Sequence, residues 1–150
     1  MILVDTNLLI YATDKANERH SAARTWLEGQ LVGDIGVAFT WVALLGFIRL
    51  STNRRIMPNP LTMAEAVDRV ATRLAHGKSR LVGPTLDHWP HLQTMLWAAP
   101  QGGNLTTDAH LAAVAVEHDC ELCSADGDFS RFPGLKWRNP LASAQMGAAS

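Results

Sequence analysis

The chain has 150 residues, of which 47% are hydrophobic and 18% are charged, so it is long enough for one domain with a buried core and too apolar for a disordered protein. Thirteen Lys and Arg against 14 Asp and Glu give a net charge of −1, which excludes nucleic-acid binding through a generally basic surface. Two cysteines exclude a disulfide framework, and the chain shows neither a signal-peptide pattern nor an apolar run long enough to cross a membrane. A cytoplasmic protein with no membrane segment is therefore expected.

The first half of the chain predicts two strands and three helices in front of an exposed loop. Residues 2–4 are apolar and end at Asp5, as a buried parallel strand does. Thr40 precedes the apolar stretch 41–51 and is a candidate N-cap for a helix there. The other elements expected are helices over 6–13 and 17–31, a strand over 35–39 and a loop over 53–60.

The second half continues the alternation of helices and strands. Thr62 and Glu65 have the spacing of a capping box, and Thr106 or Thr107 is expected to cap a later helix. The elements expected here are helices over 62–76, 86–99 and 108–118, strands over 81–82, 121–124 and 135–137, and a turn-rich segment over 126–133. This order predicts an α/β fold with a mainly parallel sheet, as one domain over 1–141 with a loose tail over 142–150.

Four carboxylates are expected to meet at one end of this sheet. Asp5 follows the first strand, Asp126 and Asp128 follow a late strand, and Asp108 begins the helix before that strand. Parallel sheets bind ligands beyond the carboxyl ends of their strands. Crowded carboxylates raise one another's pKa unless a cation neutralises them, and hard oxygen ligands favour Mg²⁺ or Mn²⁺. The pattern therefore indicates metal-assisted hydrolysis of a phosphodiester.

Each of these aspartates also has a purely structural explanation. Asp5 is a candidate cap for the helix after it, and Asp108 is an acid in a first helical turn, which the helix dipole favours. Asp126 and Asp128 flank Gly127 in a sequence typical of a turn. Their joint placement at one end of the sheet is what favours a metal site.

Other candidate sites are weaker. Cys120 and Cys123 lie three apart on a predicted strand, where they face opposite sides, so buried thiols are expected. His88 and His91 lack further zinc ligands nearby. Five tryptophans could stack bases, but most lie in apolar helical stripes and are expected to pack in the core or an interface. They are Trp26, Trp41, Trp89, Trp97 and Trp137.

Three stretches resemble the PIN-domain ribonucleases and, more narrowly, the VapC toxins of bacterial VapBC toxin–antitoxin pairs. They are 4–7 (V-D-T-N), 107–113 (T-D-A-H-L-A-A) and 124–135 (S-A-D-G-D-F-S-R-F-P-G-L). The similarity runs from residue 1 to about residue 141, and residues 131–141 look like an actinobacterial branch. The resemblance implies an α/β/α sandwich and a Mg²⁺-dependent endoribonuclease that cleaves structured RNA, often tRNA or ribosomal RNA. It also implies a homodimer and a VapB antitoxin, with operator DNA bound only through the antitoxin.

Carried over by position, the resemblance makes Asp5, Asp108 and Asp126 the Mg²⁺ ligands, with Mn²⁺ as a substitute. Asp128 would complete the acidic cluster, and Thr6 or Asn7 would support Asp5 by hydrogen bonds. The family usually carries a further acid, most often Glu, in the stretch that here forms residues 41–52. By the flanking residues that acid should fall at Gly46 or Phe47, and neither is acidic.

Two functions follow, and a third is weaker. The first is a metal-dependent ribonuclease toxin; the second is a catalytically weak PIN-like module that acts through its antitoxin and operator DNA. A phosphatase-like hydrolase would need a nucleophilic Asp with an acid two residues later, and the Asp126–Asp128 pair lies too late in the chain for it.

RNA is expected to be held by a local basic rim, because a net charge of −1 provides no general attraction for phosphate. The predicted members of this rim are Arg49, Arg54, Arg55 and Arg131. Surplus apolar side chains on 41–51 and 92–97 predict the dimer.

Overall fold

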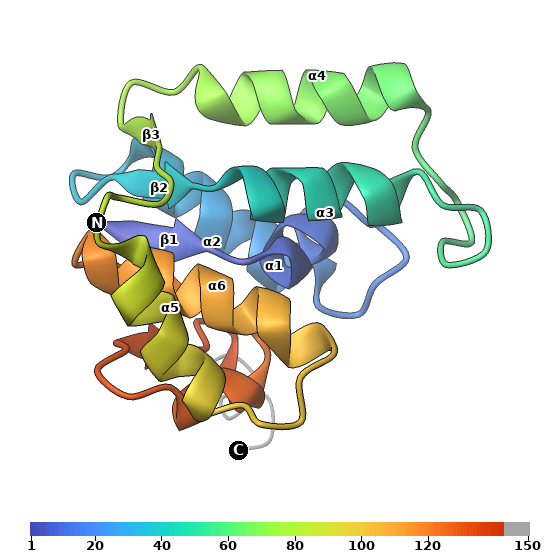
Figure 1. The fold of residues 1–150 in the computed structure, drawn as a ribbon. Coiled ribbons are helices and arrows are strands. Elements are labelled where there is room, and N and C mark those ends of the chain that lie inside the picture. The colour runs from blue at the N-terminus through green and yellow to red at the C-terminus, as the bar shows by residue number, and fades with distance from the viewer. Residues whose placement is uncertain (143–150) are drawn as a thin grey trace.

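A computed structural model describes residues 1–142 of the chain as a three-layer α/β/α sandwich (Figure 1). Its five strands pair only in parallel, in the order β3-β2-β1-β4-β5. The strands are β1 (Ile2–Val4), β2 (Val37–Phe39), β3 (Ser79–Leu81), β4 (Glu121–Cys123) and β5 (Trp137–Arg138). The predicted α/β class with a mainly parallel sheet is confirmed.

Helices cover both faces of the sheet. They are α1 (Thr6–Tyr11), α2 (His20–Val32), α3 (Trp41–Ser51), α4 (Met63–Leu74), α5 (His88–Trp97) and α6 (Asn104–Glu117), with a 3₁₀ helix η1 (Gly127–Arg131). On β1, Ile2 and Val4 pack with α1 to α4, whereas Leu3 between them packs with α5 and α6. Alternate side chains of a strand point to opposite faces, so the two core clusters lie on the two sides of the sheet.

Two predicted helix caps are confirmed. The Thr40 side chain accepts from the Ala43 N–H at the start of α3. Thr62 and Glu65 form a complete capping box at the start of α4. These caps set the starting points of the two helices that lie one over the other in Figure 1.

The predicted cap of α6 is wrong. The helix begins at Asn104, ahead of Thr106 and Thr107, directly after Gly102 and Gly103. Both glycines have positive φ, 65° and 59°, a conformation that glycine adopts without a steric penalty. The helix therefore begins four residues before the predicted start at 108, and Asp108 lies in its second turn.

Several tryptophans are not core residues. Trp41, Trp89 and Trp97 are 57%, 61% and 77% exposed, so of the two expected roles core packing is excluded for these three side chains, and packing in an interface stays a prediction. Within residues 1–142, no helix is long and apolar enough to span a membrane. All but the first residue of the expected tail over 142–150 falls outside the described part of the chain.

Candidate active site

A cavity of about 870 Å³ opens at the carboxyl end of β1. It is bounded by the N-terminal end of α1 and by α3 and α6, which come from distant parts of the sequence. Asp5 and Asp108 both line it. The structure therefore brings two of the predicted site residues into one cavity, at the end of the sheet where the strand order predicts a site.

Asp5 is fixed by two hydrogen bonds. Its Oδ1 accepts from the Thr6 N–H at 2.8 Å, and its Oδ2 accepts from the Ser124 hydroxyl at 2.8 Å. Burial raises the pKa of Asp5, the hydrogen bonds from Ser124 and Thr6 oppose that rise, and the charge of Asp126 adds to it. Asp5 is thus the cap of α1 and a rigidly oriented carboxylate of the cavity at once.

Ser124 is the residue that the sequence analysis missed. It is fully buried directly after β4, and its oxygen accepts from Asn7 Nδ2 and from the Asp126 N–H, both at 3.0 Å. A hydroxyl has one donor and two acceptor positions, and all three are used. The single proton of Ser124 is consequently directed at Asp5. Its signals in the sequence are a small hydroxyl residue at the end of a strand and its place as the first residue of the family-like stretch 124–135, where it was given no role.

Thr6 and Asn7 support Asp5 in different ways. Thr6 reaches Asp5 through its backbone N–H only, because its hydroxyl donates to the Ala43 carbonyl of α3 at 2.9 Å. Asn7 acts through Ser124, and its Oδ1 also accepts from the Ala125 N–H at 3.3 Å. The expected hydrogen-bonded support of Asp5 is present, but it passes through Ser124 and the backbone.

Asp108 is the electrostatically perturbed member of the site. Partial burial, followed by the negative charges of Asp5, Asp126 and Asp128, raises its pKa to about 6. Arg131 opposes this rise less strongly. The carboxylates are therefore close enough to repel one another, as expected from crowding at one end of the sheet.

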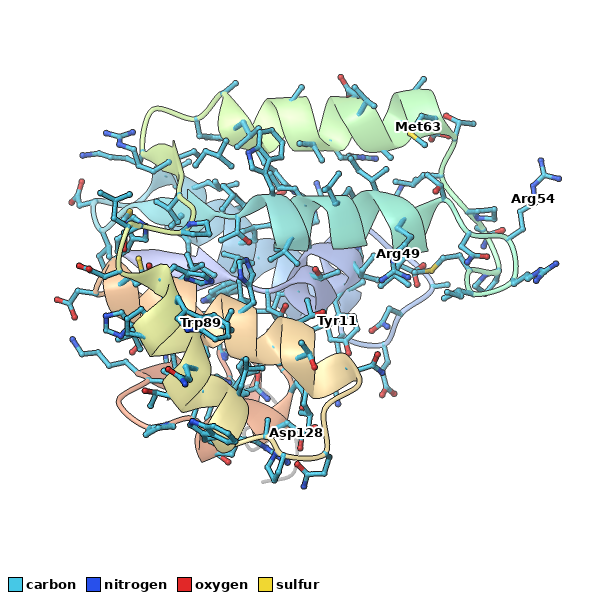
Figure 2. All side chains as sticks on the ribbon, viewed as in Figure 1. Tyr11, Arg49, Arg54, Met63, Trp89 and Asp128 are labelled. Atoms are coloured by element: carbon cyan, nitrogen blue, oxygen red, sulfur yellow. The ribbon has the colours of Figure 1, made fainter. Side chains whose placement is uncertain are left out.

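Asp126 and Asp128 also serve the local turn. Asp126 accepts from the Asp128 N–H at 2.9 Å and caps η1. Asp128 forms an ion pair of 3.3 Å with Arg131 and is about half exposed; Figure 2 shows it at the outer surface below α6. The structural explanation of this pair is thus correct, and neither residue lines the cavity that holds Asp5 and Asp108.

Asp5 and Asp108 are donors that fit a hard divalent cation. In residues 1–142, no three His, Cys, Asp or Glu side chains are grouped so that they could hold one metal ion. Asp5 and Asp108 supply carboxylate oxygens to one cavity without an ion-pair partner among the described residues. Mg²⁺ commonly takes one or two carboxylates and completes its shell with water. Asp5 and Asp108 supply that number of carboxylates, and a bound cation would relieve the repulsion between them.

The four arginines of the predicted basic rim do not lie together around the cavity. Arg49, in the last turn of α3, is exposed and lines the cavity. Arg54 and Arg55 are exposed on the loop after α3 and do not line it; Figure 2 shows Arg54 extending from the tip of that loop. Arg131 is held by Asp128 and Gln101. Only Arg49 is therefore a free cation beside Asp5 and Asp108 within the described chain.

Gly46 lies in the cavity wall and against α1. A Cβ at this position would be 2.8 Å from Thr6 Oγ1 and 3.3 Å from Thr6 Cγ2. Close packing against Thr6 of α1 thus gives one explanation for a glycine in this helix. Because Gly46 also lines the cavity, its position is compatible with the site of the missing acid.

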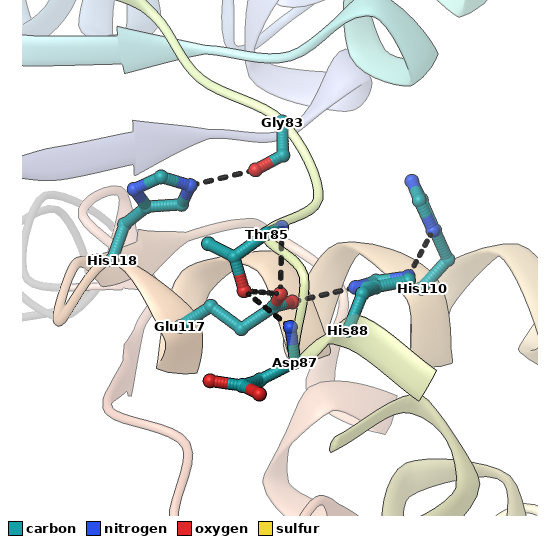
Figure 3. Close-up of polar contacts among 7 residues, drawn as sticks. All are labelled: Gly83, Thr85, Asp87, His88, His110, Glu117 and His118. Carbon is teal, nitrogen blue, oxygen red and sulfur yellow. Dashed lines mark hydrogen bonds and ion pairs between the residues drawn. The ribbon is translucent and has the colours of Figure 1, made fainter. Parts of the chain in front are cut away.

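A second polar cluster ties α5 to α6 (Figure 3). His88 Nδ1 lies 2.5 Å from Glu117 Oε2, and His88 Nε2 lies 3.0 Å from His110 Nδ1. Glu117 also accepts from the N–H and hydroxyl of Thr85. Burial works to raise the pKa of Glu117, but the hydrogen bonds from Thr85 and His88 outweigh it and lower that pKa. The cluster fixes the helix that carries Asp108.

The expectation of buried thiols is confirmed. Cys120 and Cys123 are free and buried. Burial raises the pKa of Cys123 to about 11. A thiol with such a pKa stays protonated at neutral pH and is a poor nucleophile.

The chain is similar to known proteins over nearly its whole length. Residues 2–135 match the family model of the PIN domain. Ribonuclease VapC37 of Mycobacterium tuberculosis is 44% identical over 95% of this chain and 99% of its own length. Ribonuclease VapC33 of the same organism is 36% identical over 94% and 99%. The chain belongs to the PIN-domain family and, within it, to the VapC group.

Solved structures support the fold. VapBC2 from Rickettsia felis, bound to a DNA fragment from its promoter, gives a TM-score of 0.68 at 17% identity and covers 93% of this chain and 98% of that chain. VapC20 of Mycobacterium tuberculosis, described as a sarcin-ricin loop cleaving toxin, gives a TM-score of 0.65 at 22% identity and covers 91% of this chain and 99% of that chain. At these identities the likeness concerns the arrangement of helices and strands.

Replacing Ser124 by alanine is expected to weaken the site and the fold together. Asp5 loses a donor, and the Asn7 amide and the Asp126 N–H lose an acceptor, which costs about 1–3 kcal/mol of unfolding free energy. Mn²⁺ affinity should fall by about 10–100-fold, the usual effect of removing a group that orients a ligand. Chemical denaturation and Mn²⁺ titration measure the two effects. The exposed Ser130→Ala variant is the control; equal effects in both variants would contradict the assignment.

Proposed function

We propose that the chain is a metal-dependent endoribonuclease toxin that hydrolyses phosphodiester bonds of structured RNA, such as tRNA or ribosomal RNA. The observation that carries the proposal is the pair of carboxylates, Asp5 and Asp108, that line one cavity at the carboxyl end of the sheet and repel one another. The names of the VapC37 and VapC33 relatives, both ribonucleases, support the same reaction.

In this proposal Asp5 and Asp108 hold Mg²⁺, or Mn²⁺ in its place, and Asp126 adds negative charge beside them. The bound ion supplies charge stabilisation at the scissile phosphate and an activated water. Ser124 and the Thr6 N–H keep Asp5 oriented. Arg49 binds a phosphate of the RNA at the cavity wall. Asp128 serves mainly to hold Arg131 and the turn of η1.

The second candidate is a catalytically weak PIN-like module that acts through its antitoxin and operator DNA. It is favoured by the glycine at position 46, where the family usually has an acid, and by the lack of a preformed group of three ligands in residues 1–142. Induced expression followed by sequencing of new RNA 5′ ends separates the two. The ribonuclease proposal predicts discrete new ends with the unaltered chain and none with Asp5→Ala; identical profiles would favour the second candidate.

RNA binding is expected to depend on Arg49 and only modestly on salt. Arg49→Ala should lower RNA affinity at every sequence and reduce the slope of log affinity against log salt by about 1, since one phosphate contact is lost. Filter binding or fluorescence anisotropy at several salt concentrations measures both quantities. Arg80→Ala removes an exposed arginine that only bonds local carbonyls and serves as the control. A slope as steep as that of a basic DNA-binding domain would contradict a local rim.

A homodimer and a VapB-type antitoxin are the proposed partners, with operator DNA reached only through the antitoxin. Solved relatives include a VapBC complex on promoter DNA and a toxin–antitoxin complex from Klebsiella pneumoniae. Leu45 and Met63 line the acidic cavity with 60% and 57% exposure, which suits an apolar antitoxin segment. Trp97 of α5 is the most exposed tryptophan, and it is therefore the side chain chosen to test the dimer interface.

The dimer is expected to show twice the mass of one chain in light scattering at micromolar concentration without antitoxin. Trp97→Glu should shift the mass toward one chain, because burying an unpaired charge in an apolar interface is costly. A monomer of the unaltered chain under these conditions would overturn the dimer.

A further inference from the structure

Arg73 is a buried cation with no anionic partner. The residue is 8% exposed, and no carboxylate pairs with it among residues 1–142. Its Nη2 donates to the Leu9 carbonyl at 3.4 Å and to Thr13 Oγ1 at 2.5 Å, while its Nη1 is buried without a hydrogen-bond partner in the described chain. Its guanidinium lies 4.9 Å from the centre of the Phe47 ring. A buried charge without a counter-ion is costly.

Arg73 also lines a cavity of about 300 Å³, the lower end of the range for small-ligand sites. The cavity lies among α2, α4 and the segment that follows α1, and it shares no residue with the cavity of Asp5 and Asp108. Its lining contains four permanent cations and one acid, in a chain whose net charge is −1. The charged lining residues are Lys15, Arg24, Arg69, Arg73 and Glu28, and His76 lies beside them.

The one acid in this lining is already neutralised. Glu28 forms an ion pair of 2.9 Å with Arg24 across one helical turn. Lys15 and Arg69 are exposed at the cavity and have no ion pair within residues 1–142. In the adjoining cavity, Asp14 and Glu65 accept from backbone N–H groups. Three cations therefore line this cavity without an ion-pair partner within residues 1–142, and the hydrogen bonds with Thr62, and with them the charge of Arg69, lower the pKa of Glu65.

We propose that this cavity is a phosphate-binding site, in which Arg73 forms the base and Lys15 and Arg69 close over the anion. A guanidinium presents donors in a planar fork that matches phosphate oxygens, and Arg73 lines the cavity with no anion paired to it among residues 1–142. Burial, and next to it the charge of Arg69, lower the pKa of Arg73 to about 10, so the group remains cationic at neutral pH. The site is independent of the ribonuclease proposal.

A purely structural role for Arg73 would be to cap the C-terminal end of α1. That role explains the Nη2 contacts, since a cation near a helix C-terminus is favourable. Capping, however, gives no account of the unpartnered Nη1 or of Lys15 and Arg69. The two roles predict different responses to added phosphate.

The test titrates the full chain with inorganic phosphate, by calorimetry and by thermal unfolding, against sodium chloride at matched ionic strength. Phosphate should raise the unfolding midpoint in a saturable way, because a ligand of the folded state stabilises it. The Lys15→Ala and Arg69→Ala changes together should weaken phosphate affinity by at least about tenfold, the effect of losing charge-assisted hydrogen bonds. Lys136→Ala, which removes an exposed lysine beside β5, should leave it unchanged.

Arg73→Met keeps the aliphatic stem and removes the charge. The proposal predicts that this variant loses the phosphate response and is no less stable than the unaltered chain when phosphate is absent. An unaltered chain without a saturable response beyond that in chloride would overturn the proposal, as would equal losses in the Lys15/Arg69 and Lys136 variants. If Arg73→Met does not fold, the variant with Lys15→Ala and Arg69→Ala still tests the proposal, because both of its substitutions are at exposed positions.

Both a free nucleotide and an RNA backbone carry a phosphate group that could occupy this cavity. A competition experiment distinguishes these two sources of the ligand. In the Asp108→Asn protein, which should not cleave RNA, adenosine 5′-monophosphate is compared with an RNA oligonucleotide that has hydroxyl groups at both ends. Displacement of phosphate by the nucleotide alone indicates a monoester ligand, and displacement by the oligonucleotide indicates a backbone contact. Displacement by neither would contradict a phosphate-ester site. Phosphate binding should persist in Asp108→Asn even if the ribonuclease proposal fails.

Discussion

Asp108→Asn is expected to raise the stability of the metal-free chain above about pH 6 and to abolish tight Mn²⁺ binding. The pKa of Asp108 is raised from 3.8 to about 6, by burial first and then by its acidic neighbours. Between these values the folded chain holds a proton that the unfolded chain has released, so stability falls as pH rises through this window and stays low above it. Asparagine at position 108 cannot ionise, so the variant does not show this loss of stability. Mn²⁺ affinity should fall by more than the roughly 10–100-fold typical of residues that only orient a ligand.

Thermal unfolding from pH 4 to pH 8, with and without Mn²⁺, measures both effects. Without metal, the midpoints of the two proteins should converge near pH 4 and separate toward pH 8. Mn²⁺ should raise the midpoint of the unaltered chain and leave that of Asp108→Asn in place. Asp87→Asn, an exposed acid that accepts no cap hydrogen bond, is the charge-matched control. Equal Mn²⁺ affinity of Asp108→Asn and the unaltered chain would refute Asp108 as a ligand.

The second large effect is expected at Gly46, through its contact with Thr6. Gly46→Ala gains about 1 kcal/mol of helix propensity, but its Cβ would lie 2.8 Å from Thr6 Oγ1, and overpacking costs about 1–3 kcal/mol. Thr6→Ala removes the two closest atoms. Gly46→Ala should therefore destabilise the unaltered chain by about 1 kcal/mol and be neutral or stabilising beside Thr6→Ala. A double-mutant cycle of unfolding free energies measures this coupling, and a value near zero would rule out the close contact.

Gly46→Glu tests whether this position belongs to the metal site. Because Gly46 lines the acidic cavity, a carboxylate there should raise Mg²⁺ affinity and ribonuclease activity, most clearly beside Thr6→Ala, which makes room for it. If position 46 only serves packing, the glutamate is an unpaired charge and destabilises by several kcal/mol. A folded Gly46→Glu protein with unchanged metal binding and cleavage would exclude the catalytic role of this position.

Local sequence rules predicted the sheet and two of the aspartates well. A short apolar run that ends in an acid places Asp5 at the end of β1, and the alternation of elements brings α6 and Asp108 to the same end. The start of α6 was wrong because two adjacent glycines with positive φ overrode the threonine caps. The role of Ser124 could not be recognised because two of its three hydrogen bonds, with Asp5 and Asn7, join residues more than a hundred positions apart.

The burial and pairing of charged side chains also could not be predicted from the sequence, because both depend on tertiary packing. Arg73 reads as an ordinary cation at the end of an amphipathic helix. It becomes a buried group only because α4 lies over Phe47 of α3 and the end of α1. The divided basic rim has the same cause, since the folding of η1 commits Arg131 to Asp128 and Gln101.

The most direct test is cleavage of a structured RNA by the purified chain with Mg²⁺, with excess chelator, and by Asp5→Asn with Mg²⁺. Cleavage should require Mg²⁺, return when the chelator is titrated out, and fall by at least about 100-fold in Asp5→Asn, because charge stabilisation by the ion is worth several kcal/mol. Asp87→Asn should cleave at the rate of the unaltered chain. Cleavage that persists in chelator, or in Asp5→Asn at the unaltered rate, would contradict a metal-dependent site built on Asp5 and Asp108.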